Sequence, residues 1–226
     1  MRFTMDIYEA LYTTRAMRRV KPDPIPDTVQ AQILDAAIRA PSGGNTQNWR
    51  FLLLDDPEKK KLLGPLYRDA LDQLYRTIYA PRMAAVAADP DSPESIQMAK
   101  VAKSSQWLAD HFEQVPLFLF AFVQWDRTGG SIFPAVWSAQ LAARVNGVGS
   151  ALTSILGAFH DHEVKEILGV PADDDWKQAC CVSFGYPTGR WAVAPRRPAH
   201  EVAYRNGWGE PVGFTVDEPL WQPSKD

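Results

Sequence analysis

The chain has 226 residues, of which 46% are apolar, and this is enough material for one large domain or at most two. Its formal net charge of −3 gives no electrostatic case for binding nucleic acid. No apolar run approaches the roughly 20 residues of a membrane-spanning helix, and the N-terminus lacks the pattern of a signal peptide.

The first part of the chain predicts two helices joined by an extended segment. Met5 to Tyr12 forms a short helical pattern, and the alternating prolines between residues 21 and 26 exclude a helix there. The next helix begins at Asp27 or Thr28 and is expected to stop at Pro41. A polar connection then leads to a strand predicted from Trp49 to Asp55.

Longer elements are predicted in the middle of the chain. Pro57 opens a helix whose apolar face is expected to be Leu62, Leu66, Ala70, Leu74 and Ile78. Residues 87–93 have the composition of a loop, and residues 94–112 return to a helix. Residues 116–123 form a continuous apolar run, which predicts a strand that is covered on both faces.

The helix that follows Gly129-Gly130-Ser131 is apolar almost all round its circumference. Such a helix lies in a core or in a subunit interface. It is expected to end at Gly147 and Gly149, and three short elements follow: an extended segment over residues 150–155, a helix over 161–168 and a strand over 179–184.

After Gly185-Tyr186-Pro187 the chain is rich in proline and has no regular pattern. About forty such residues at the end of a domain need something to pack on, and a partner subunit is the simplest candidate. We therefore expect one domain over residues 1–226, with residues 187–226 as an extended C-terminal arm. Helices outnumber about four strands, which predicts an α+β fold: a small sheet wrapped by helices.

The sequence offers few residues for acid, base, nucleophilic or metal chemistry. His160 and His162 are the only clustered histidines, and their spacing does not make a convincing metal site. The two cysteines, Cys180 and Cys181, lie in a strand pattern and are expected to be buried, inert thiols of a reducing cytoplasm. No nucleophile elbow, Walker loop or complete dinucleotide fingerprint occurs, so we assign no catalytic side chain.

Two other features are open to more than one interpretation. The stretch from Ala40 to Arg50 concentrates neutral hydrogen-bonding groups around Gly43 and Gly44. By itself it is typical of a helix C-cap with one glycine in the left-handed conformation. The arginines at 15 and 18, and those at 196 and 197, are either surface residues or planar forks that suit a phosphate monoester.

Taken together, these motifs resemble the family of FMN-dependent nitroreductases and related flavin reductases. The matching pieces occur in family order from about Asp6 to Gly209: residues 14–18, residues 22–26, residues 40–49, Gly147-Val148-Gly149-Ser150, Gly185-Tyr186-Pro187, Arg196-Arg197-Pro198 and Trp208-Gly209. Asn48 stands where the family more often has proline, and Ala16 replaces a frequent serine. The resemblance implies a small, mainly antiparallel sheet flanked by helices, in an intertwined homodimer with FMN at its interface.

The resemblance also implies roles for individual residues. Arg15 and Arg18 would bind the FMN phosphate and ribityl chain together with Arg196, for which Arg197 is the alternative. Ala16 belongs to the same segment. Pro41, Ser42 and Asn45 would line the isoalloxazine ring, together with Gln47. The backbone of Leu152 and Thr153 would approach the N5–O4 edge of the flavin. Hydride chemistry would reside in the flavin, which explains why no catalytic side chain is found.

The implied activity is ping-pong electron transfer from NAD(P)H through FMN to a small electron-poor acceptor, such as a nitroaromatic or a quinone. Two alternatives remain open: other flavin chemistry on the same scaffold (reductive dehalogenation, dehydrogenation or flavin degradation), or an FMN-binding module without turnover. Residues 66–105 are the expected source of a substrate lid, unless these helices only cover the sheet.

Overall fold

The computed structural model describes residues 5–222, and its elements alternate between helices and short strands. The helices and strands are α1 (Ile7–Thr13), α2 (Asp27–Ala37), β1 (Trp49–Leu54), α3 (Pro57–Arg76), α4 (Ala80–Ala88), α5 (Pro93–Asp110), β2 (Leu117–Val123), α6 (Ile132–Val145), β3 (Gly149–Thr153), α7 (Ile155–Phe159), α8 (Asp161–Leu168) and β4 (Lys177–Gly185). Short 3-10 turns occupy Gly43–Asn45, Phe112–Gln114 and Ala199–Glu201.

The strands form one sheet with the order β1-β2-β4-β3, and every neighbouring pair is antiparallel. This confirms the prediction of a small, mainly antiparallel sheet flanked by helices. Every residue of β2 is buried, as its continuous apolar run predicts. Alternate side chains of a strand point to opposite faces, so this sheet must be covered on both sides.

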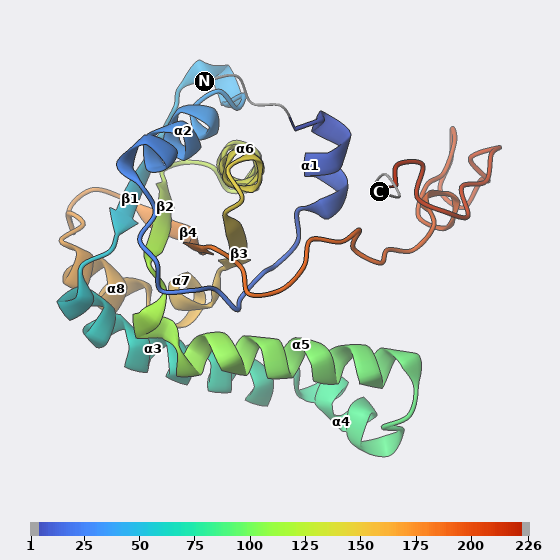
Figure 1. Cartoon of the computed structure of the whole chain (residues 1–226), viewed down its shortest axis with the longest axis horizontal. Coiled ribbons are helices and arrows are strands. Elements are labelled where there is room, and N and C mark those ends of the chain that lie inside the picture. The colour runs from blue at the N-terminus through green and yellow to red at the C-terminus, as the bar shows by residue number, and fades with distance from the viewer. Residues whose placement is uncertain (1–4, 223–226) are drawn as a thin grey trace.

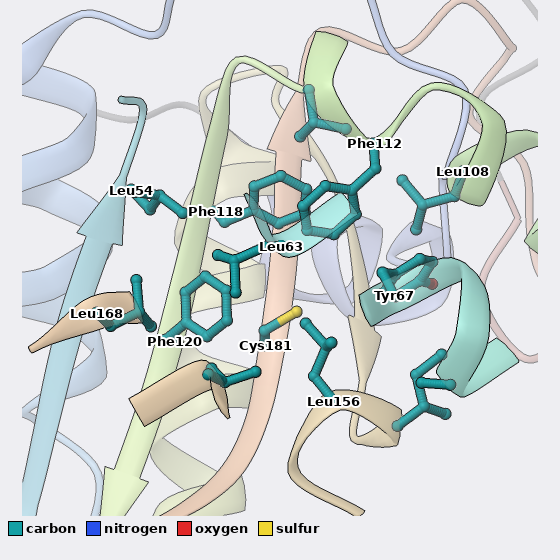
Figure 2. Close-up of a cluster of buried hydrophobic side chains, with 14 of the residues drawn as sticks. Leu54, Leu63, Tyr67, Leu108, Phe112, Phe118, Phe120, Leu156, Leu168 and Cys181 are labelled. Carbon is teal, nitrogen blue, oxygen red and sulfur yellow. The ribbon is translucent and has the colours of Figure 1, made fainter. Parts of the chain in front are cut away.

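Two apolar clusters provide that cover. On one face, the phenylalanines at 118, 120 and 122 pack with residues of α3, α5, α7 and α8. Figure 2 shows Phe118 and Phe120 in a shared core with Leu63 and Tyr67. On the other face, Leu117, Leu119 and Ala121 pack with residues of α2 and α6. The sheet is therefore the middle layer between two helical layers.

Helix α6 lies between α2 and α1 in Figure 1. Its buried side packs on the sheet through residues such as Ile132, Val136 and Ala139. Its other side carries Phe133 and Trp137, which are 42% and 40% exposed and lie four positions apart, on one helical face. A helix that is apolar all round thus buries one face in this chain and leaves an aromatic face uncovered.

Adjacent cysteines lie inside the sheet, where Cys180 and Cys181 are both free and buried. Burial raises the pKa of Cys180 to about 12, and burial together with the neighbouring Cys180 also raises the pKa of Cys181. Both thiols are therefore held in the protonated form, which is not nucleophilic. This agrees with the expectation that they are inert.

We expect a thiol reagent at mildly alkaline pH to label neither cysteine in the native protein and both cysteines after denaturation. Mass spectrometry of the labelled protein counts the modified thiols in each state. Rapid labelling of the native protein would contradict the burial of this pair.

Several sequence-based boundaries need correction. The apolar face predicted for α3 is wrong at its two ends, because Leu62 and Ile78 are 59% and 63% exposed. Its middle is confirmed, since Ala70 is buried and the leucines at 66 and 74 pack against the same core. A strict spacing of four residues rotates gradually around a helix of 3.6 residues per turn, so the two ends of the predicted stripe leave the core. Helix α7, which follows β3 directly, was not predicted.

The polar stretch after α2 is not a helix C-cap. Helix α2 ends at Ala37, before Pro41, and its C-cap residue Ile38 has a right-handed conformation. The left-handed glycine is Gly44, with φ of 58°, and it lies in the separate turn Gly43–Asn45. Hydrogen bonds of residues 38–40 back to α2 end the helix before the glycines are reached.

Two segments extend away from the layered body in Figure 1. Helices α4 and α5 project together at one end of the molecule, with α5 packing on α3 and α4. The C-terminal segment, coloured orange to red, runs past α1 and contains no α-helix or strand over residues 186–222. Within residues 5–222 we find no helix that combines the length and the apolar character needed to cross a membrane.

Candidate functional site

The N-terminal arginine segment, residues 15–19, is fixed by backbone hydrogen bonds to one end of the antiparallel pair β3–β4, where β3 begins and β4 ends. The amide of Met17 donates to the carbonyl oxygen of Ser150 over 2.8 Å, and Ala16 forms a parallel bridge with the same residue. Further along, Lys21 donates to the carbonyl oxygen of Tyr186 over 2.8 Å. Met17 is buried by this arrangement, whereas Arg15 and Arg18 are only half-buried and remain accessible.

A second set of contacts anchors the chain just before this segment. The guanidinium of Arg144, in α6, is buried and pairs with Glu9 of α1 at 2.9 Å. It also donates to the hydroxyl of Thr13 over 2.8 Å and lies 4.1 Å from the ring centroid of Trp191. One buried cation therefore joins α1, α6 and the start of the C-terminal segment, and it holds the entry to Arg15 in place.

The arginine segment lines a hollow of about 490 Å³ whose charged side chains are all positive. Among residues 5–222, none of these cations forms an ion pair. Its walls are residues 15–19, one side of α5, and the turn after β4; the lining residues are Arg15, Ala16, Met17, Arg18, Arg19, Lys100, Lys103, Ser104, Thr188 and Gly189. Uncompensated guanidinium and ammonium groups around one space favour an anion, and a phosphate monoester suits them well.

The candidate residues of β3 lie near the same segment. Leu152 and Thr153 are half-buried at the end of β3 and pair with β4. Burial is the main influence that raises the pKa of Tyr67, while the positive charge of Arg18 and a hydrogen bond with Thr153 act to lower it. Ser150, near the start of the same strand, accepts the backbone hydrogen bond of Met17, so one protomer brings the arginine segment and β3 together.

The polar turn over residues 41–47 is exposed and conformationally strained. Asn45 and Gln47 have positive φ values of 54° and 52°, which non-glycine residues seldom adopt. The amide of Gln47 donates to the hydroxyl of Ser42 over 3.2 Å, and the side chain of Gln47 donates to that of Asn45 over 3.1 Å. Pro41 is exposed at the start of the turn. Strain retained in an exposed polar turn is consistent with a binding role.

This turn does not meet the arginine segment within one protomer. Its Gly43 amide donates to the hydroxyl of Ser131 at the start of α6, over 3.2 Å. Ser150, which anchors the arginine segment, accepts a hydrogen bond from Gln140 further along α6, over 3.0 Å. At about 1.5 Å per residue, Ser131 and Gln140 are about 13 Å apart along the helix axis. The two groups of candidate residues are therefore anchored at separate positions on α6, one at its start and one in its second half.

The model of the nitroreductase family matches residues 11–186, which is most of the chain. The chain belongs to the nitroreductase family. The match includes the arginine segment, the strained turn, α6 and the whole sheet, and it stops before the C-terminal segment.

Comparisons with individual proteins agree with this nitroreductase-family assignment. A Thermus thermophilus protein named NADH dehydrogenase is 41% identical over 59 residues, which is 26% of this chain and 29% of that relative. The aligned segment thus spans less than a third of the relative's length.

Two solved structures share the fold. An iodotyrosine deiodinase bound to FMN and 3-iodo-L-tyrosine has a TM-score of 0.69 at 22% identity, with 89% of this chain and 99% of that chain covered. An NADPH:FMN oxidoreductase from Vibrio harveyi, complexed with NAD+, has a TM-score of 0.64 at 19% identity, covering 89% and 77% of the two chains.

The C-terminal arginines of this nitroreductase-family chain line a different hollow, of about 930 Å³, together with Leu11, Trp137, Phe214 and residues 216–220. Arg196 is exposed and donates to the carbonyl oxygen of Pro195 over 2.8 Å. Arg197 pairs with Glu201 at 3.2 Å. Neither arginine lines the hollow around Arg15 and Arg18, so their phosphate role stays a prediction.

Sequence reasoning did not single out several groups around the cationic hollow. Lys100 and Lys103 are on α5, Arg19 follows the predicted pair, and Thr188 donates its amide to the carbonyl oxygen of Arg19 over 3.1 Å. The spacing of three residues between the lysines was a readable signal for one helical face. The sequence does not show that this face lies opposite the arginine segment. That depends on the packing of α5, which is about eighty positions away from Arg18 in the sequence.

Proposed function

We propose that this protein is an FMN-dependent oxidoreductase that moves electrons from NAD(P)H to a small electron-poor acceptor, such as a nitroaromatic or a quinone. The observation that carries the proposal is the cationic hollow beside β3, in a chain of the nitroreductase family. The structural neighbours that hold FMN, or are named as FMN oxidoreductases, support the same cofactor here.

The residues present fit FMN. The phosphate would be held by Arg15 and Arg18, whose planar forks and lack of counter-charges suit a dianion. The backbone of Ala16, together with Leu152 and Thr153, would border the ring. When bound, FMN supplies the hydride chemistry, and donor and acceptor use it in turn at one face. The protein's own groups bind and orient the cofactor, and no side chain is proposed as an acid, base or nucleophile.

We further propose a homodimer in which a second copy completes the site. Two observations support it. Phe133 and Trp137 form an uncovered aromatic face on α6, and such apolar patches mark interfaces between chains. The strained turn of residues 41–47 lies too far along α6 to reach the arginine segment of its own chain. In the dimer, Pro41, Ser42, Asn45 and Gln47 would approach the cofactor from the other copy.

The remaining assignments follow from composition and fold. Residues 1–226 would act as one domain, with residues 187–226 as an arm that packs on the second copy and carries Arg196 and Arg197. The acceptor is a small molecule, and neither nucleic acid nor membrane is a proposed partner. Two free, buried cysteines suit a reducing compartment, so the proposed location is the cytoplasm.

A second candidate function is reductive dehalogenation on the same scaffold. It is favoured by the likeness to the iodotyrosine deiodinase structure, which covers 89% of this chain with a TM-score of 0.69. A third, from another class, is an FMN-binding module without turnover. All three require FMN, and they differ in what oxidises it.

The test uses the purified full chain. We expect a yellow protein whose visible spectrum is that of FMN, and steady oxidation of NADH or NADPH when a nitroaromatic or a quinone is added. Varying donor against acceptor should give the parallel double-reciprocal lines of a ping-pong mechanism. A colourless protein that added FMN does not restore would overturn the proposal. Turnover with halogenated aromatics but not with quinones would favour dehalogenation, and tight FMN binding without NAD(P)H oxidation would favour the binding module.

A further inference from the structure

Helix α5 contributes two lysines to the cationic hollow, and no part of the proposed function yet uses them. Lys100 and Lys103 are three positions apart, so they project from one face of the helix. Both are exposed, and both line the hollow together with Arg15, Arg18 and Thr188. The hollow is thus bounded by three segments that are distant in sequence: the arginine segment, α5 and the turn after β4.

The hollow carries more positive charge than Arg15 and Arg18 alone supply. Its lining has five cationic side chains and no carboxylate. Cations held around one space repel one another unless an anion lies between them. A phosphate monoester carries between one and a half and two negative charges at neutral pH, and its three terminal oxygens accept several hydrogen bonds. Such a group can be shared by donors from both walls.

We propose that Lys100 and Lys103 of α5 complete, with Arg15 and Arg18, the binding site for the phosphate of FMN. This inference rests on the proposed function. Lysine suits the opposite wall because its ammonium is a compact charge with three donors on a flexible stem. The lysines are binding residues for the cofactor and take no part in the chemistry at its ring.

The placement of α5 gives this site a structural consequence. Helices α4 and α5 project away from the layered body, and α5 packs mainly on α3 and α4 (Figure 1). A phosphate held between Lys100, Lys103 and the arginine segment joins the projecting helix to the edge of the sheet. Bound FMN should therefore restrain α5, whereas a flavin without a phosphate should leave this helix as it is in the free protein.

The test compares FMN with riboflavin, which has the same ring and ribityl chain but no phosphate. The double variant Lys100→Gln/Lys103→Gln should bind FMN at least about tenfold more weakly than the original protein, since charge-assisted hydrogen bonds are lost. Its affinity for riboflavin should be unchanged. The matched control is Lys59→Gln/Lys61→Gln on α3, which removes the same charge outside the hollow. Lys59 is half-buried, and Lys61 is exposed and pairs with Glu58. Flavin fluorescence titration measures both affinities.

Hydrogen exchange supplies a second readout that is independent of activity. FMN should slow exchange over residues 93–104 in the original protein, and riboflavin should not. In the lysine variant the effect of FMN on this segment should disappear, while protection of β3 by bound flavin remains.

The outcomes separate this inference from the proposed function. If the lysine variant keeps the FMN-to-riboflavin affinity ratio while Arg18→Gln lowers it, the inference is wrong and the FMN site stands. If the lysine variant keeps FMN but loses a preference for NADPH over NADH, the lysines serve the dinucleotide and the inference is overturned. An original protein that binds FMN no better than riboflavin overturns the inference and the phosphate assignment together.

Discussion

Replacing Arg18 with alanine should release FMN while leaving the fold intact. Arg18 is half-buried at the wall of the cationic hollow and forms no ion pair in the described part of the chain. Its removal therefore breaks no internal partnership, but it deletes a charged contact to phosphate worth about 1.5–3 kcal/mol. The dissociation constant of FMN should rise about 10- to 150-fold. Visible absorbance of the purified variant measures the flavin retained per chain, and fluorescence titration measures the affinity.

Arg39→Ala is the matched control for this experiment. Arg39 lies just beyond α2, is exposed and pairs with Asp35 of the same helix, so its loss changes the net charge equally without touching the hollow. The control should keep its flavin. An Arg18→Ala protein with unchanged FMN affinity and unchanged circular dichroism would show that the phosphate is bound elsewhere.

Replacing Trp137 with glutamate should dissociate the homodimer. Trp137 and Phe133 form the uncovered aromatic face of α6, where a tryptophan is typical of the residues that dominate interface energy. A carboxylate buried at this position loses its hydration without gaining a partner, so association should weaken by about 3 kcal/mol or more. Light scattering coupled to gel filtration measures the molecular mass at several concentrations. The variant should also lose FMN, because each proposed site needs the 41–47 turn of the other copy.

Leu62→Glu separates this effect from a general cost of placing a charge at an exposed apolar side chain. Leu62 is 59% exposed on α3 and does not belong to the α6 face. This control should remain dimeric and yellow. A Trp137→Glu protein that stays dimeric with full flavin content would disprove the proposed interface.

Strongly patterned elements were predictable because their local pattern and their tertiary environment agree. The run Leu117–Val123 could only be a buried strand, and every residue of β2 is buried. The alternating prolines of residues 22–26 excluded a helix, and the chain there has neither helix nor strand between α1 and α2. Local pattern failed for α3, where several registers of apolar residues compete and packing against the sheet selected Leu63 and Tyr67 over Leu62. It also failed for Gly43 and Gly44, because hydrogen bonding of residues 38–40 ended α2 first.

The sequence by itself determined the α+β class, the small sheet, the burial of the cysteines and a set of motifs in the order of the nitroreductase family. These properties depend on residue type and short-range spacing, and both can be read directly from the sequence. Only the tertiary structure decided which candidates share a site. It brought Arg15 and Arg18 to β3 and to the lysines of α5, and it left the 41–47 turn against the start of α6. The physical reason is that a binding site is formed by the packing of distant segments, and that packing is set by how helices cover the two faces of the sheet rather than by any local pattern.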